Sequence, residues 1–89
     1  MWRFVEIRNV ADVPRYWAAK TPDKTALVEG DAQRSYAQLD ARSNAVANRL
    51  LKMGLKRGDT VGYIGKNSIE VWEVWFGAAK AGLAFAPFN

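Results

Sequence analysis

The sequence predicts an α/β fold made of a helix, a small hairpin and a βαβ unit with parallel strands. Three observations lead to this prediction. A capped amphipathic pattern spans residues 35–54, residues 60–64 are apolar on both faces, and a second helical pattern at 69–81 runs into a short apolar segment at 83–86. Because the strand, helix and strand at 60–86 are joined by short connections, the two strands are expected to be parallel.

The composition is that of an ordinary globular protein, with 49% apolar and 25% charged residues in 89. This length allows one small domain or a piece of a larger one. Cysteine and histidine are both absent, which excludes disulfides, thiolate metal sites and the commonest general base. Charges near the amino terminus argue against a signal peptide, and no apolar run reaches membrane-spanning length. A cytoplasmic protein without a membrane span is therefore expected.

The first helix is expected at 10–20 and is ended by Thr-Pro-Asp at 21–23. Asn9 or Asp12 could provide the N-cap, and Pro14 favours Asp12 because proline suits the first helical turn. The expected buried stripe has three members at helical spacing: Val13, Tyr16 and Trp17.

A small hairpin should follow this helix. Residues 25–29 form its first strand and 33–35 its return, and the turn at 29–32 contains Gly30, which tolerates positive φ.

The long helix after the hairpin carries clear signals at both ends. Ser35 and Gln38 form a capping box, Gly54 ends the helix as a C′ residue, and Leu55 makes the accompanying apolar contact. One face is apolar and consists of Tyr36, Leu39, Val46, Leu50 and Met53. The opposite face is polar and consists of Asp40, Arg42, Arg49 and Lys52.

The βαβ unit begins after a tight connection at 56–59. A buried strand at 60–64 leads to Asn67 or Ser68, either of which could cap the helix at 69–81. Gly82 ends this helix, and the last strand at 83–86 precedes a proline.

The helix at 69–81 is apolar around most of its circumference. Its polar stripe is narrow and consists of Glu70, Glu73, Gly77 and Lys80. Such a helix is normally buried on several sides, and this chain offers few elements to bury it. We therefore expect that residues 1–89 are a fragment of a larger domain. Self-association through Trp72 and Trp75 is the alternative.

The net charge of +4 arises from 13 basic and 9 acidic residues spread along the chain. Arg42, Arg49 and Lys52 share one helix face, which is more often a solvated surface than a phosphate-binding track. No nucleic-acid partner is expected, and a small basic nucleic-acid binder remains only a third alternative.

Residues that could carry chemistry have simpler structural explanations. Gly65 and Lys66 suggest a phosphate loop, but that motif needs glycine at position 60 and serine or threonine at 67, where the chain has Thr60 and Asn67. Glu29 and Asp31 offer too few oxygens for a hard cation. The remaining candidates are interpreted as helix caps (Ser35, Ser68) and core aromatics (Tyr36, Tyr63).

Five segments together resemble the AMP-forming acyl-CoA synthetases and other adenylate-forming (AMP-binding) enzymes. Ser-Tyr-Ala-Gln-Leu at 35–39 is similar to their Thr/Ser-Tyr-x-Glu-Leu motif, and Ala-Lys-Ala-Gly-Leu-Ala-Phe-Ala-Pro-Phe-Asn at 79–89 to Leu-Lys-Ala-Gly-Gly-Ala-Tyr-Val-Pro. The segment 54–61 resembles Gly-Val-x-x-Gly-Asp-x-Val, 21–27 resembles Thr-Pro-Asp-x-x-Ala, and Asn-Ser at 67–68 also matches. The departures are Gln38, Ala79, Leu83 and Phe85. These departures concern which substrate subgroup of the family the chain resembles, and not its resemblance to the family.

The resemblance implies that the chain is part of the large N-terminal domain of a ligase. Such an enzyme uses ATP and Mg²⁺ to turn a carboxylic acid into an acyl-adenylate and then transfers the acyl group to a thiol, usually coenzyme A. The family's phosphate loop, ribose-binding aspartate and catalytic lysine lie beyond Asn89, so no catalytic, cofactor-binding or metal-binding residue is assigned here. The fragment alone is expected to be inactive. An adenylation domain that loads a carrier protein is the alternative within the family, and a short interaction module is one outside it.

Overall fold

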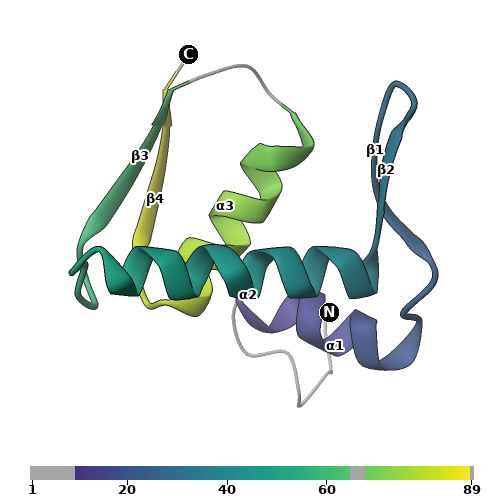
Figure 1. Cartoon of the computed structure of the whole chain (residues 1–89), viewed down its shortest axis with the longest axis horizontal. Coiled ribbons are helices and arrows are strands. Elements are labelled where there is room, and N and C mark those ends of the chain that lie inside the picture. Colours follow the sequence, from purple (N-terminus) through teal and green to yellow (C-terminus); the bar gives the residue numbers. More distant parts are fainter. Residues whose placement is uncertain (1–9, 65–67, 89) are drawn as a thin grey trace, which may run out of the picture.

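The computed structural model describes residues 10–64 and 68–88 (Figure 1). The elements are, in order, α1 (Asp12–Lys20), β1 (Thr25–Glu29), β2 (Ala32–Ser35), α2 (Tyr36–Lys52), β3 (Thr60–Ile64), α3 (Ile69–Lys80) and β4 (Ala84–Phe88). This order confirms the predicted α/β fold with a helix, a hairpin and a βαβ unit.

The β1–β2 hairpin is antiparallel, with Val28 opposite Gln33 and Glu29 opposite Ala32. Gly30 has φ of +57°, the conformation that the predicted turn requires of a glycine. Because Ala32 pairs with Glu29, the second strand starts one residue before the predicted return at 33–35.

Helix α2 begins and ends as its local sequence predicts. The Ser35 hydroxyl accepts the Gln38 backbone N–H at 3.1 Å, and the Gln38 side chain accepts the Ser35 N–H at 2.8 Å, which completes the capping box. At the other end Gly54 has φ of +94°. Its N–H donates to the Leu51 carbonyl at 3.0 Å, and the Leu55 N–H donates to the Leu50 carbonyl at 3.4 Å. These two bonds form the Schellman motif.

Strands β3 and β4 are parallel, with Thr60 opposite Ala84 and Val61 opposite Phe85, and α3 connects them. The predicted βαβ unit is therefore present. The last strand was predicted at 83–86 and instead runs from Ala84 through Pro87 to Phe88. A proline fits here because, among residues 10–64 and 68–88, β4 pairs with β3 alone, so one edge of the strand has no ladder to interrupt.

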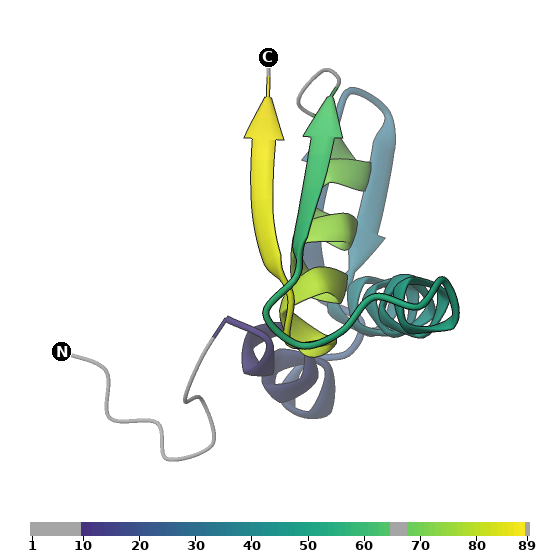
Figure 2. The same cartoon turned by 90° about the vertical axis from the view of Figure 1, so that its left-hand side faces the viewer.

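Helix α3 lies between the β3–β4 sheet and the hairpin (Figure 2), and α2 crosses its carboxyl-terminal half (Figure 1). Helix α1 packs against α2 from the other side. The buried apolar core is small and consists of Pro14, Leu39, Ala47, Ile69, Ala78 and Leu83. The face of the β3–β4 sheet that points away from α3 has no helix or strand against it within the described part of the chain.

Two details of the predicted helices are wrong. Ala11, and not Asp12, occupies the N-cap position of α1, and Asp12 is the first helical residue, whose carboxylate accepts a hydrogen bond from Arg15 at 2.9 Å. The other proposed cap, Asn9, lies outside the described residues. Met53 was placed on the apolar face of α2, yet it is 70% exposed. It follows the helix as its C-cap residue, where the chain already turns away.

Candidate functional site

Three members of the polar stripe of α3 (Glu73, Gly77, Lys80) face α2, and two of them, Glu73 and Gly77, are buried. Glu73 is only 4% exposed. Its Oε2 atom accepts hydrogen bonds from Nε of Arg34 on β2 at 3.1 Å and from Nε of Arg42 on α2 at 2.6 Å. These three residues, which we call the Glu73 cluster, join the hairpin, α2 and α3. A carboxylate removed from water is tolerated here because two guanidinium groups compensate its charge.

A second polar contact holds the other end of the same helix pair. The Lys80 ammonium donates to Oδ1 of Asp40 at 2.6 Å and to Oδ1 of Asn44 at 2.8 Å. The Lys80 and Asp40 side chains are 13% and 23% exposed, so Asp40 lies at the helix interface although the sequence placed it on the polar face of α2. Both ion pairs are therefore structural contacts between α2 and α3.

An aromatic array extends from α3 across the sheet and consists of Tyr63, Trp72, Trp75, Phe76 and Phe85. The Trp72 and Trp75 rings stack with centroids 5.2 Å apart, and Trp75 lies 6.2 Å from Phe85. The two tryptophans remain 42% and 37% exposed. The helix is thus not buried on all its apolar sides by the described residues.

The residues singled out for chemistry do not form a catalytic site. Glu29 lies near the start of α3, where its Oε1 is 3.4 Å from the Ile69 N–H. Ser35 is a cap as predicted, and Tyr36 lies beside the Trp17 ring at 6.2 Å. Ser68 occupies the N-cap position of α3 as predicted, but its side chain makes no capping hydrogen bond. Gly65, Lys66 and Asn67 lie outside the described residues.

No group of three or more His, Cys, Asp or Glu side chains that could hold a metal ion gathers in residues 10–64 and 68–88. In the same ranges no helix is long and apolar enough to cross a membrane.

Comparison with known proteins identifies the larger group to which this fold belongs. The family model described as AMP-binding enzyme matches residues 14–89. The chain belongs to this family. The matched region contains all the elements from the first turn of α1 to β4, so the resemblance seen in the short motifs is confirmed over nearly the whole chain.

The relatives to which this chain is similar are much longer than this chain. It is 39% identical over 81 residues to a medium/long-chain-fatty-acid–CoA/3-oxocholest-4-en-26-oate–CoA ligase of Mycobacterium marinum, covering 91% of this chain and 15% of that ligase. It is 32% identical over 84 residues to the fatty acid–[acyl-carrier-protein] ligase ScoC of Streptomyces coeruleorubidus, covering 94% and 16%. The solved fatty acyl CoA synthetase of Mycobacterium tuberculosis is 34% identical with a TM-score of 0.86, covering 94% of this chain and 17% of that one.

The Glu73 cluster is the main feature that the sequence did not reveal. Its acidic residue was noted as part of a polar stripe, but its two arginines are 39 and 31 residues away. The only available signal was a glutamate in the middle of an otherwise apolar helix. That pattern indicates a buried charge that needs a partner, although it does not say which arginine provides one.

Proposed function

We propose that residues 1–89 form the amino-terminal part of the large AMP-binding domain of a carboxylate-activating enzyme. The whole enzyme would form an acyl-adenylate from ATP and a carboxylic acid, with Mg²⁺, and then a thioester with coenzyme A. The family match over residues 14–89 carries this proposal. The names of the relatives support a fatty acid as the substrate class.

Within such an enzyme this chain would contribute structure and no catalytic group. Its buried carboxylate, Glu73, and its part-buried ammonium, Lys80, are both engaged in ion pairs between elements, which supports a structural role for both. The chain also covers only 15% of the ligase from M. marinum. We therefore propose that the 89-residue chain is inactive alone.

Exchange of labelled pyrophosphate into ATP, in the presence of fatty acids of several lengths, tests this inactivity. The purified 89-residue chain should give no exchange above a blank, whereas the M. marinum ligase run in parallel should give a clear signal. Exchange that depends on both the fatty acid and this chain would contradict the proposal.

A chimera tests the assignment to an enzyme. Residues 14–89 would replace the matched segment of the M. marinum ligase, which is 39% identical. We expect the chimera to retain acyl-adenylate formation, because the two segments build the same fold. The gene beyond the codon for Asn89 gives an independent test, since an open frame with a Gly/Ser/Thr-rich loop is expected there.

Transfer to a carrier protein is a second candidate for the final step. The relative from S. coeruleorubidus is named as a fatty acid–[acyl-carrier-protein] ligase, and it matches this chain over a similar length as the CoA ligases do. Offering the full-length enzyme either coenzyme A or a phosphopantetheinylated carrier protein would separate the two. The cytoplasmic location stays a prediction in either case.

A non-enzymatic interaction module is the candidate from another class. The exposure of Trp72 and Trp75, at 42% and 37%, supports contact with a partner or a second copy through the aromatic array. Sedimentation of the isolated chain at increasing concentration would test this, and a single monomeric species throughout would argue against self-association.

A further inference from the structure

A cleft at the junction of α2 and α3 has more positive than negative charge on its walls. It has a volume of about 350 Å³ and is lined by Arg42, Ala45, Val46, Arg49 and Glu73. That volume is many times the roughly 30 Å³ that one water molecule occupies in the liquid. The cleft can therefore hold a small ion together with part of its hydration.

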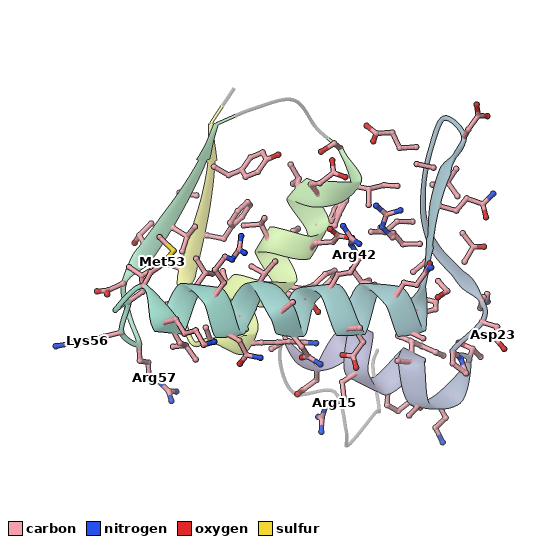
Figure 3. The ribbon with its side chains drawn as sticks, viewed as in Figure 1. Arg15, Asp23, Arg42, Met53, Lys56 and Arg57 are labelled. Carbon is pink, nitrogen blue, oxygen red and sulfur yellow. The ribbon has the colours of Figure 1, made fainter. Side chains whose placement is uncertain are left out.

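The two arginines of this cleft lie seven residues apart on α2, so both project from the same side of the helix. The Nε atom of Arg42 bonds the buried Glu73 at 2.6 Å. Its two Nη groups make no hydrogen bond with the described residues, and the guanidinium of Arg49 makes neither a hydrogen bond nor an ion pair with them. Figure 3 shows Arg42 directed from α2 toward α3, whereas Arg57 points away from the body of the molecule.

The only carboxylate of the cleft is already committed. Oε2 of Glu73 accepts from both Arg34 and Arg42, and Arg34 also lies 4.0 Å from Glu70. Three guanidinium groups (Arg34, Arg42, Arg49) thus meet two carboxylates (Glu70, Glu73), which leaves a net charge of +1 around the cleft. A cation is disfavoured there and an anion is favoured.

We propose that this cleft binds a phosphate group, with Arg42 and Arg49 as its two ligands. Glu73 is a positioning residue: by bonding Nε it fixes the plane of the Arg42 guanidinium and leaves the Nη pair available to an incoming anion. A carboxylate has two oxygens and is satisfied by one guanidinium fork. A tetrahedral phosphate has oxygens for two forks, which fits a pair of arginines better.

The test is a titration of the 89-residue chain with inorganic phosphate, followed by the NMR signals of the arginine Nε–H groups. We expect saturable shifts for Arg42 and Arg49 with a dissociation constant in the millimolar range, about −4 kcal/mol. Acetate at equal ionic strength should give no saturation. Shifts that rise linearly with either salt, or saturate equally with acetate, would overturn the proposal.

Arg49→Gln is the decisive variant, because Arg49 has no partner in the described part of the chain and its loss should leave the fold intact. It should weaken phosphate binding about tenfold, the loss expected for a charge-assisted hydrogen-bonded contact. Arg57→Gln removes the same charge from a side chain outside the cleft and should change the dissociation constant less than twofold. Equal weakening by both variants would mean only general charge attraction and would contradict the site.

Glycerol 3-phosphate distinguishes the source of the phosphate group. Tighter binding than inorganic phosphate, lost with Arg49→Gln, would support a phosphomonoester as the ligand. Binding of inorganic phosphate alone would support the site with the free ion as its ligand, and binding of neither would refute it.

Discussion

Glu73 shows how one buried side chain joins elements that are distant in sequence. It is 4% exposed, and its Oε2 accepts from guanidinium groups on β2 and α2. Burying an ionised carboxylate is costly, and breaking a buried pair costs more than an exposed pair gains. The contact therefore disfavours other packings of β2, α2 and α3 more than it stabilises the observed one. Any packing that separates Glu73 from Arg34 and Arg42 leaves a buried charge without a partner.

Replacing Glu73 should destabilise the chain although the size of the side chain is kept. Glu73→Gln is expected to lower the free energy of unfolding by about 1–3 kcal/mol, since the amide weakens both charge-assisted hydrogen bonds. Arg42 is half exposed, with 52% of its side chain accessible, which keeps the loss below that of a fully buried pair. Urea unfolding followed by circular dichroism measures the change.

Glu70→Gln is the matched control for this substitution. Glu70 lies on the same helix, but its side chain is 57% exposed and 4.0 Å from Arg34. Its replacement should change stability by less than about 0.5 kcal/mol. Equal effects of the two variants would contradict the special role of the buried position.

At the scale of elements, the pairing of α2 and α3 depends on small residues at their closest approach. Ser43, Ala47, Gly77 and Ala78 are all buried. A Cβ atom built on Gly77 would lie 2.5 Å from Cγ1 of Val46 and 2.9 Å from the Ser43 carbonyl oxygen. The two helices are therefore too close for any side chain at position 77, and this closeness brings the polar stripe of α3 within reach of α2.

Gly77→Ala should destabilise the chain by about 1–3 kcal/mol through overpacking, against a helix-propensity gain of up to about 1 kcal/mol. Combining it with Val46→Ala should relieve only part of the overpacking, because Cβ of residue 46 and the Ser43 carbonyl oxygen, 2.6 and 2.9 Å from the added Cβ, both remain. Thermal unfolding of the single and double variants measures this. A single variant more stable than the starting protein would show that the helices are not in close contact.

The two helix caps give a matched pair of serines. Ser35→Ala should cost about 1 kcal/mol, because it removes the hydroxyl that accepts the Gln38 N–H in the capping box. Ser68→Ala should cost only a few tenths of a kcal/mol, since its side chain makes no capping bond. Denaturant unfolding compares them, and a larger loss at Ser68 would contradict the observed caps.

At the scale of the whole molecule, the chain exposes more aromatic surface than its core can cover. The aromatic array runs over α3 and the β3–β4 sheet, which has two strands within the described part of the chain. Two-stranded sheets are marginal without further packing, and parallel sheets are usually covered on both faces. These features agree with the proposal that the chain is part of a longer AMP-binding enzyme, in which other parts of the enzyme would cover this surface.

Trp72→Lys tests the proposed self-association through the aromatic array: if the isolated chain associates, this variant should associate less. Trp72 is 42% exposed at the end of the array, so its replacement removes apolar contact area with little loss of core packing. Sedimentation velocity over a range of concentrations should show a smaller associated fraction than in the starting protein. Met53→Lys serves as control: Met53 is 70% exposed but lies outside the array, and it should leave the association unchanged.

The sequence by itself determined the features that depend on near neighbours. The capping box joins residues three apart, the Schellman motif at Gly54 involves six consecutive residues, and the turn at Gly30 needs only one residue with positive φ. The alternation of strand and helix was likewise enough to predict the parallel pairing of β3 and β4. Local hydrogen bonding and backbone sterics decide these features, so they can be recognised without the fold.

Only the tertiary structure decided which helix faces meet and what they bury. The sequence grouped Arg42 with Arg49 and Lys52 as a polar face and placed Met53 on the apolar one. In the structure Arg42 bonds the buried Glu73, while Met53 is 70% exposed. Periodicity separates polar from apolar faces, but the close approach at Gly77 made the polar stripe of α3 an interface. Which helix faces meet depends on partner residues some 30–40 positions away along the chain, and packing sets where those partners lie.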